Sequence, residues 1–140
     1  MEAANREILN YTTALSHLLG LADLERMVDQ TSFRSNSSLT IFKTFMQRLG
    51  NPETCAPVVH IAGTKGKGST CAIVTAILAA AGYRVGLFSS PHLYSFRERI
   101  RIGLNPISER DFSMIMSSIW PYAAEMKTRN RPITTFELLT

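Results

Sequence analysis

One stretch of the chain, residues 58–69, constrains the fold more than any other. It begins with an apolar, β-branched run that is typical of a buried strand, and it continues into a glycine-rich loop. The residues that follow, 70–81, have the composition of a helix. A strand, a glycine loop and a helix in this order form the layout that holds a nucleotide's phosphates, because glycines let the backbone approach and the helix N-terminus faces the anion. Lys67 would add the positive charge.

The loop departs from the standard pattern G-x-x-x-x-G-K-[ST] at two positions. Ile61 stands where that pattern has its first glycine, and Gly68 displaces the hydroxyl residue by one place, to Ser69. A second interpretation is a glycine-rich turn in an α/β protein, with an incidental lysine. The strand predicted before the loop and the helix predicted after it favour phosphate binding.

Length and composition are typical of a soluble globular protein. The chain has 140 residues, enough for a single domain with one core, and it is 45% hydrophobic and 19% charged. No apolar run approaches the roughly 20 residues of a membrane span. The N-terminus resembles neither a signal peptide nor a transit peptide, and the two cysteines suggest no disulfide framework or metal site. We expect a cytoplasmic protein.

The net charge of +4, from 15 basic and 11 acidic residues, suits an anionic substrate such as a nucleotide. It could also favour nucleic acid. The charges are scattered, however, and no RNA-binding aromatic motif accompanies them, so we expect no nucleic-acid partner.

Apolar spacing predicts two helices before the loop. The first covers residues 8–20, and the second covers residues 39–49 after a polar loop at 31–38. Ser37 or Ser38 is a plausible N-cap of the second helix, and Gly50 would close it.

Around the loop, strands at 58–62 and 85–88 flank the helix and predict a parallel pair with a right-handed crossover. Ligands bind at the carboxyl ends of such strands, so the segment 89–92 should lie beside the phosphate loop. Residues 96–102 alternate in charge and predict a half-exposed strand. The fold class is therefore α/β with a parallel sheet.

The C-terminal third predicts one helix and the start of another element. Ser108 and Asp111 form a pattern like a capping box, and the helix after them should be interrupted or kinked by Pro121. A turn is expected at 130–132. The segment 134–140 begins a further element, whose apolar residues would have little to pack against if the protein ended there.

Four motifs in this order are specific in combination. They are Leu49-Gly50-Asn51-Pro52, the loop Ile61-Ala62-Gly63-Thr64-Lys65-Gly66-Lys67-Gly68-Ser69-Thr70-Cys71, the pair Phe88-Ser89-Ser90-Pro91-His92-Leu93 and Arg97-Glu98-Arg99-Ile100, and Thr135-Phe136-Glu137-x-Leu139-Thr140. Together they resemble the folylpolyglutamate synthases and dihydrofolate synthases of the Mur ligase superfamily. Loops of that superfamily carry a related Gly-Thr-x-Gly-Lys pattern, which explains the displaced hydroxyl.

The resemblance implies an incomplete, Mur ligase-like ATPase domain with a parallel sheet. Residues 1–52 would be its N-terminal helical segment, with two helices, and residues 53–140 the first part of its ATP-binding domain. Family enzymes are about three times as long, so the chain would be the N-terminal part of such a ligase. We expect that this part alone binds phosphate weakly and does not ligate.

The resemblance also implies the reaction. Family enzymes use ATP to join the carboxylate of folate or dihydropteroate to the amino group of L-glutamate, through an acyl phosphate. Lys67 would be the catalytic residue that contacts the β- and γ-phosphates, and Ser90 and Glu137 would hold Mg²⁺, which prefers oxygen ligands. The full-length protein would be a monomer. The nucleotide-binding residues implied are Gly63, Thr64, Lys65, Gly66, Lys67, Gly68 and Ser69.

Plainer interpretations exist for several of these residues. Ser90 could form a turn before proline, and Glu137 could be an acid that stabilises the first turn of a helix. We expect His92 to pack or to support its loop. Arg97 and Arg99 could face an anionic substrate, although alternating charges on a strand more often form a solvated face.

Two other functions compete with the folate ligase. One is another Mur-type ligase, such as a cell-wall precursor enzyme, although those enzymes usually have a hydroxyl residue directly after the lysine. The other is a non-catalytic nucleotide-binding module. The sequence does not separate dihydrofolate synthase from folylpolyglutamate synthase activity.

Overall fold

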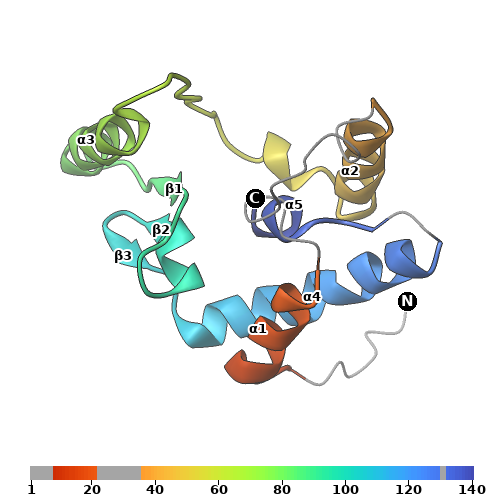
Figure 1. Ribbon diagram of the computed structural model, residues 1–140. Coiled ribbons are helices and arrows are strands. Elements are labelled where there is room, and N and C mark those ends of the chain that lie inside the picture. The colour runs from red at the N-terminus through yellow and green to blue at the C-terminus, as the bar shows by residue number, and fades with distance from the viewer. Residues whose placement is uncertain (1–7, 22–35, 130–131) are drawn as a thin grey trace. The chain divides into compact units, whose positions relative to one another are not determined.

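The computed structural model describes residues 8–21, 36–129 and 132–140 (Figure 1). The chain divides into two compact units. The helical unit consists of residues 1–56 and 112–140, and the sheet unit consists of residues 57–111. The division predicted from the sequence, at residue 52, concerns the complete domain and stays a prediction.

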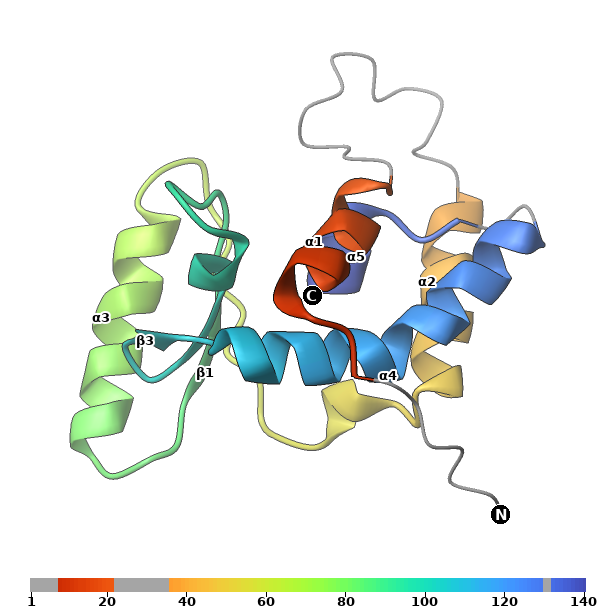
Figure 2. The same ribbon diagram turned by 90° about the horizontal axis from the view of Figure 1, so that it is seen from below.

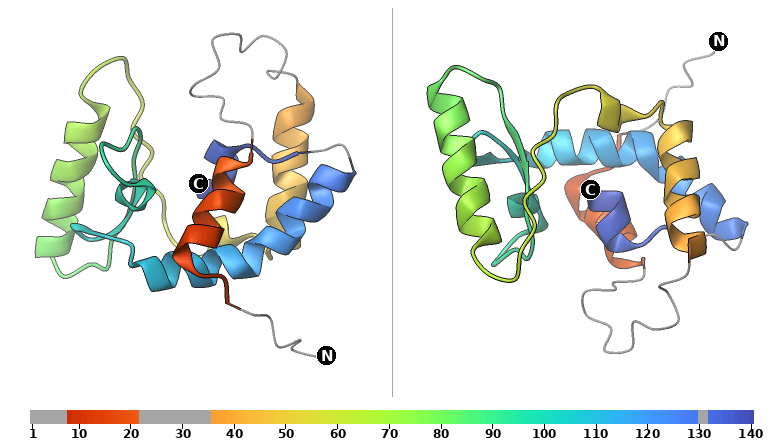
Figure 3. Two further views of the ribbon diagram at one scale, coloured as in Figure 1. Left: turned by 60° about the horizontal axis from the view of Figure 1, so that its bottom comes forward. Right: turned by 90° about the horizontal axis from the view of Figure 1, so that it is seen from above.

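The helical unit is built from α1 (Tyr11–Leu19), α2 (Asn36–Arg48), the short 3-10 helix η1 (Pro52–Thr54), most of α4 (Glu109–Thr128) and α5 (Thr135–Leu139). Helices α1 and α5 lie side by side (Figures 2 and 3), and the Thr135 hydroxyl donates a hydrogen bond of 3.3 Å to the Leu18 carbonyl. Among the described residues, no helix is both long and apolar enough to cross a bilayer.

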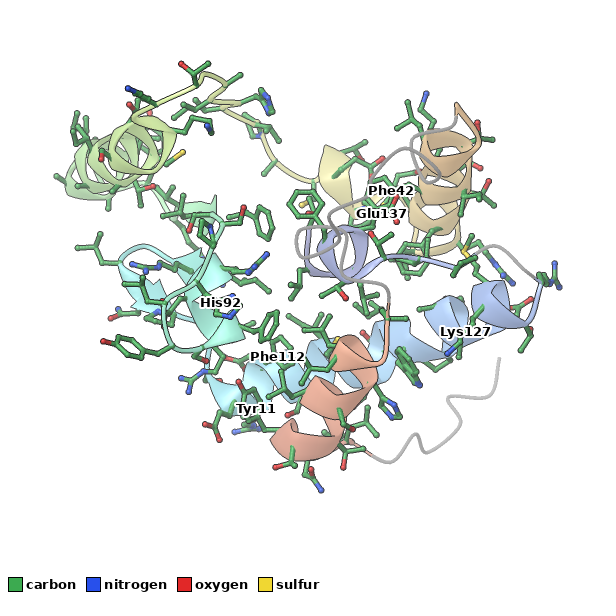
Figure 4. The ribbon with its side chains drawn as sticks, viewed as in Figure 1. Tyr11, Phe42, His92, Phe112, Lys127 and Glu137 are labelled. Atoms are coloured by element: carbon green, nitrogen blue, oxygen red, sulfur yellow. The ribbon has the colours of Figure 1, made fainter. Side chains whose placement is uncertain are left out.

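The core of the helical unit forms where α1, α2 and α5 bury apolar side chains together with α4. The rings of Tyr11 and Phe112 meet edge to face at 5.5 Å (Figure 4), and His17 stacks on Trp120 at 4.3 Å. These contacts join α1 to α4. The buried apolar side chains of the unit include Ala14, Leu18, Phe45, Phe112, Met116, Ala123, Met126, Ile133, Leu138 and Leu139.

Both predicted N-terminal helices are present, with different starts. Helix α1 begins at Tyr11 because Asn10 caps it, its side-chain oxygen accepting from the Thr13 amide at 2.8 Å. Helix α2 begins at Asn36, so the predicted caps at 37 and 38 lie inside the helix and that prediction is wrong. Part of the loop predicted at 31–38 and most of the turn at 130–132 fall outside the described residues.

Helix α4 continues through Pro121, so of the two expected effects, an interruption or a kink, the interruption is wrong. Proline costs a helix interior about 3 kcal/mol because it removes one hydrogen bond and crowds the preceding turn. Buried side chains lie on both sides of the proline, with Phe112 and Met116 before it and Met126 after it. Burial of a side chain of this size contributes roughly 1.5–3 kcal/mol, so together the three outweigh the proline.

Helix α5 packs better than its sequence suggested. Leu138 and Leu139 are only 6% and 5% exposed and so do pack, whereas Phe136, the third apolar residue of this face, is 39% exposed. Thr134 and Glu137 form a reciprocal capping box that starts this short helix.

The sheet unit has three antiparallel strands in the order β1-β2-β3: β1 (Gly86–Phe88), β2 (Ile100–Ile102) and β3 (Asn105–Pro106). Helix α3 (Lys67–Ala80) contacts β1, and the 3-10 helix η2 (Phe96–Arg99) leads directly into β2. The strand predicted at 96–102 is therefore a strand only in its second half. Its first half turns because Ser95 and Glu98 form a capping box at η2.

The predicted strand at 58–62 is not formed, and the parallel pair is absent from the described residues. Val58 and Val59 are 77% and 66% exposed. A strand exists only through hydrogen bonds to a neighbour, and β1 pairs with β2 instead of with this segment. The β-branched residues thus favour a strand, but the part of the chain that the structure describes offers them no partner strand.

One ion-pair cluster makes the stability of the helical unit depend on pH. Arg48 of α2 and Arg129 each approach the Glu125 carboxylate to 2.7 Å. The hydrogen bond from the Arg48 side chain, aided by both positive charges, lowers the pKa of Glu125 below its ordinary value of 4.5. A lowered pKa in the folded state stabilises the fold at pH values above 4.5, and this contribution is lost as the pH falls through the lowered pKa.

We therefore expect Glu125→Gln to weaken the dependence of stability on pH below 4.5 while changing stability little under those acidic conditions. Urea unfolding of the chain at pH 7 and at pH 3, followed by the fluorescence of its single tryptophan, measures this. Glu53→Gln in η1 is the control. Equal pH dependence in the wild type and in Glu125→Gln would refute the assignment.

Candidate functional site

The glycine loop ends at Gly66, which turns the chain into α3. Gly66 has φ +76° and ψ −2°, a left-handed conformation that favours glycine. Its carbonyl accepts the Thr70 amide and the Thr70 hydroxyl, both at 2.9 Å, and the amide bond is the first of the helix. The helix thus starts at Lys67, three residues before the predicted start at 70.

Because the helix starts early, three residues of the predicted loop belong to its first turn. Lys67, Gly68 and Ser69 form the first helical turn, whose N–H groups precede the first helical hydrogen bond. Such groups carry the positive end of the helix dipole and favour an anion. All residues from 62 to 70 are exposed. The exposed N–H groups of this turn can therefore attract an anion from solvent.

Lys67 folds back over the loop. Its ammonium group donates a hydrogen bond of 2.6 Å to the carbonyl of Gly63. The lysine charge therefore lies over the loop, between its first glycine and the N-terminal end of α3.

A glycine can be required because a side chain would not fit or because the backbone is left-handed, and Gly66 and Gly68 distinguish these two reasons. At both positions an added Cβ would meet no atom within 4 Å, so only the backbone conformation differs between them. We expect Gly66→Ala to destabilise the loop by roughly 1–2 kcal/mol, because alanine is strained in the left-handed region. Gly68→Ala, in a helix, should be neutral or stabilising by up to about 1 kcal/mol. Amide exchange in α3 measures both effects, and equal effects of the two substitutions would refute the prediction.

A second loop, the Ser90 loop (residues 89–95), follows β1. Figures 2 and 3 show it at the same end of the sheet unit as the N-terminus of α3. Ser90 is exposed, and the Ser90–Pro91 peptide bond is cis. The structure therefore brings the two predicted loops to one end of one unit.

Glu98 fastens the Ser90 loop to η2. Its Oε2 accepts the Leu93 amide at 2.9 Å, and its Oε1 accepts the amides of Tyr94 and Ser95 at 2.9 and 2.8 Å. These three N–H donors, that of Leu93 foremost, lower the pKa of Glu98 below its ordinary value. The sequence interpretation missed this role, although Ser95-x-x-Glu98 fits the capping-box pattern that would have indicated it.

Arg99 also holds the Ser90 loop, through His92, and its burial corrects the expectation of a solvated arginine face. Its side chain is only 5% exposed, and its Nε donates to His92 Nδ1 at 2.8 Å. The guanidinium also lies over the Phe96 ring, which packs against His92 at 4.2 Å. His92 therefore supports its loop, as we expected. Arg97 likewise turns inward, with Nε donating to the Ile107 carbonyl at 2.6 Å.

Glu137 starts α5. Its Oε2 accepts from both the amide and the hydroxyl of Thr134 at 2.9 Å, and the Glu137 amide donates to that hydroxyl at 3.2 Å. This is the helix-stabilising role that the plainer interpretation gave it. Glu137 belongs to the helical unit (Figure 4) and Ser90 to the sheet unit. Within the described ranges, no three His, Cys, Asp or Glu side chains gather as a metal site.

This chain is similar to known proteins in both sequence and structure. No protein-family model matches the chain. The dihydrofolate synthase/folylpolyglutamate synthase of Bacillus subtilis is 39% identical over 99 residues, which are 70% of this chain and 23% of that protein. The folylpolyglutamate synthase of Arabidopsis thaliana is 36% identical over 127 residues, 89% of this chain and 20% of that protein. The chain thus spans about a quarter or less of these relatives.

Solved structures agree with the sequence relatives. The folylpolyglutamate synthase of Thermotoga maritima matches 92% of this chain and 28% of its own, with a TM-score of 0.78 and 33% identity. That of Mycobacterium tuberculosis, complexed with ADP and AMPPCP, matches 90% of this chain and 27% of its own, with a TM-score of 0.70 and 34% identity. A third match, with a TM-score of 0.73 and 26% identity, is a complex with AMPPCP and folate that covers 94% of this chain and 30% of its own. The chain therefore belongs to the folylpolyglutamate synthase and dihydrofolate synthase family.

Proposed function

We propose that this chain supplies the phosphate-binding part of a ligase that joins L-glutamate to the carboxylate of folate or dihydropteroate. The observation that carries the proposal is the turn at Gly66 and Lys67, which sets a lysine and a helix N-terminus over one exposed loop. The matched synthases include complexes with ADP, AMPPCP and folate, which supports ATP and a folate as ligands.

The chemistry needs positive charge where the γ-phosphoryl group is transferred. In the proposed reaction the substrate carboxylate takes this group from ATP, and the glutamate amine then displaces phosphate from the acyl phosphate. Lys67 is the catalytic residue in this proposal, because its ammonium stabilises the charge that develops on the phosphate oxygens. Backbone N–H groups of Gly66, Gly68 and Ser69 add further donors, and Gly63, Thr64 and Lys65 complete the loop.

Mg²⁺ would neutralise part of the phosphate charge when it is bound. Ser90 and Glu137 are the proposed oxygen donors, and both suit a hard cation. Ser90 is exposed beside its cis-proline, and Glu137 is half-buried with Oε2 on Thr134. In this proposal Glu137 combines coordination with its role as a helix cap.

The parallel sheet of the ATPase domain is part of the proposal. Residues 58–62 would become a strand in a longer protein, next to a strand from outside the described residues. Two features support this: Val58 and Val59 are exposed, and α3 exposes Ile73 and Ile77 by 60% and 62%. Exposed apolar residues in this number on one small unit favour coverage by further structure. The chain alone would then bind phosphate weakly and form no amide.

Gly68→Ala gives a prediction specific to phosphate binding. Because Gly68 has space for a methyl group and lies in a helix, the substitution should preserve the fold. The methyl group would stand where the backbone approaches the phosphates, so AMPPCP affinity should fall by about tenfold or more, equivalent to 1.4 kcal/mol. Isothermal titration measures this. Unchanged affinity would show that phosphate does not approach Gly68, and Gly20→Ala in the cap of α1 is the control.

The proposed function is tested on the longest polypeptide that the gene encodes, called here the complete polypeptide. ADP release is followed with ATP and L-glutamate, with dihydropteroate in one reaction and tetrahydrofolate in another. Release with dihydropteroate alone means dihydrofolate synthase, with tetrahydrofolate alone folylpolyglutamate synthase, and with both a bifunctional enzyme. No acceptor-dependent release with either would refute the folate assignment. The 140-residue chain, assayed in parallel, should release no ADP in an acceptor-dependent way.

A further inference from the structure

The Ser90 loop is fixed at both of its ends by the segment that follows it. At its start, Phe88 of β1 pairs with Ile100 of β2, and the Ser89 amide donates to the Arg99 carbonyl at 3.0 Å. Ser90 is therefore the first residue beyond the strand ladder. At its other end, three successive amides of the loop converge on the carboxylate of Glu98.

Three consecutive N–H groups that point to one place form a concavity that binds anions. In this protein the carboxylate of Glu98, from η2, occupies the concavity. A carboxylate suits this position because it only accepts hydrogen bonds and has two oxygens to share among the three donors. The bond from a neutral donor to a charged acceptor is also stronger than one between neutral groups.

Arg99, the residue after Glu98, also holds the Ser90 loop. Its buried side chain holds His92 through a hydrogen bond of 2.8 Å, and His92 lies two residues after Ser90. Two adjacent residues of η2 thus hold the same loop, Glu98 through backbone amides and Arg99 through a side chain.

Helix capping alone does not explain the contacts of Glu98. A capping box at η2 needs Glu98 to accept the amide of Ser95, which is the N-cap residue. The amides of Leu93 and Tyr94 lie before the cap and outside the helix, yet the same carboxylate accepts both. These two bonds constrain the loop and not the helix.

We propose that Glu98 is a positioning residue, which holds the Ser90 loop so that the Ser90 hydroxyl is presented to a magnesium–nucleotide complex. Glu98 acts through the backbone of residues 93–95 and touches neither the ion nor the nucleotide. The inference rests on the nucleotide and magnesium part of the proposed function. It deepens that function by assigning a residue that fixes the geometry of a proposed ligand.

The test compares three variants of the complete polypeptide. Glu98→Ala removes both acceptor oxygens and with them all three hydrogen bonds. Glu98→Gln keeps one amide oxygen, which can still accept from Tyr94 and Ser95, but it turns a donor group toward the Leu93 amide. Glu109→Ala is the matched control, because its carboxylate lies in the same unit and pairs with Arg97 at 3.2 Å.

Two properties are measured in each variant: amide hydrogen exchange of residues 93–95, and the affinity for AMPPCP with and without Mg²⁺. In Glu98→Ala we expect faster exchange of these amides and a loss of about tenfold in the affinity gained from Mg²⁺, because groups that orient a metal ligand typically contribute 10–100-fold. Affinity without Mg²⁺ should be unchanged. Glu98→Gln should be intermediate, and Glu109→Ala should match the wild type.

Two results would overturn the inference. One is unchanged exchange in Glu98→Ala, and the other is faster exchange with an unchanged gain from Mg²⁺. A loss of AMPPCP affinity that is equal with and without Mg²⁺ would also count against it, since that pattern reports a general structural defect. A wild-type polypeptide that gains magnesium-dependent affinity but forms no glutamylated product would refute the proposed function alone. One that gains no affinity from Mg²⁺ would refute both.

Discussion

Replacing Lys67 by methionine should lower the rate of ATP-dependent glutamate ligation by the complete polypeptide by about 10²–10³-fold, the usual effect of losing one charge-stabilising donor. Methionine keeps a long, unbranched side chain and removes the ammonium group. It also removes the hydrogen bond to the Gly63 carbonyl that closes the loop in this structure. The effect should appear in kcat, because the charge that Lys67 stabilises is greatest in the transition state.

The measurement is ADP release over a range of ATP concentrations up to saturation, with Lys43→Met as the control. Lys43 is an exposed lysine on α2, in the helical unit, so its loss should leave kcat unchanged. Lys67→Met with wild-type kcat and a raised KM for ATP would indicate that the lysine contributes only to ground-state binding. Wild-type values of both would refute its assignment to the phosphates.

Replacing Phe112 by alanine should have the largest effect on stability, about 3–5 kcal/mol of unfolding free energy. The Phe112 side chain is 2% exposed and meets the Tyr11 ring edge to face at 5.5 Å (Figure 4). Its removal would therefore leave a cavity in the core of the helical unit and break an aromatic contact between α1 and α4. Small domains are stable by only about 5–15 kcal/mol, so this loss would bring the unit close to unfolding.

Urea unfolding of the 140-residue chain, followed by the fluorescence of Trp120, measures this loss. Ile115→Ala is the matched control, because Ile115 lies on the same helix and is 49% exposed. The control should lose less than about 1 kcal/mol, since a half-exposed side chain buries little area on folding. Similar losses in both variants would mean that Phe112 does not belong to the core of the unit.

Local patterns in the sequence predicted the helices well, because a helix satisfies its hydrogen bonds within one segment. Apolar spacing located α1 and α2, and the pattern of Ser108 and Asp111 located the start of α4, where the Asp111 amide donates to the Ser108 hydroxyl at 3.0 Å. The same local view did not show that α4 would continue through Pro121, because packing on both sides of a residue is not visible in its neighbours along the chain.

Strands were predicted less well, for the opposite reason. The residues of segment 58–62 favour a strand, but a strand depends on a partner that sequence spacing does not reveal. Residues 96–102 alternate as a strand does, yet the local capping box of Ser95 and Glu98 made the first half a 3-10 helix. Charge alternation likewise could not show that Arg99 is buried against His92.

The residues of the candidate site were named from motifs, and the structure adds the geometry of three of them. Lys67 lies over its loop, Gly66 requires a left-handed backbone, and Ser90 follows a fixed strand end. The supporting residue Glu98 was missed: the capping-box pattern Ser95-x-x-Glu98 indicates its bond to the Ser95 amide, but no motif marks the amides of Leu93 and Tyr94, which it also accepts.

The identity of the product tests the central claim most directly. The complete polypeptide is incubated with ATP, L-glutamate and either dihydropteroate or tetrahydrofolate, and the products are identified by mass spectrometry. The account predicts that at least one acceptor gains glutamyl residues, that the gain requires ATP, and that Lys67→Met slows it by about 10²–10³-fold. ATP hydrolysis without any glutamylated acceptor would contradict the account and leave a nucleotide-binding protein of another function.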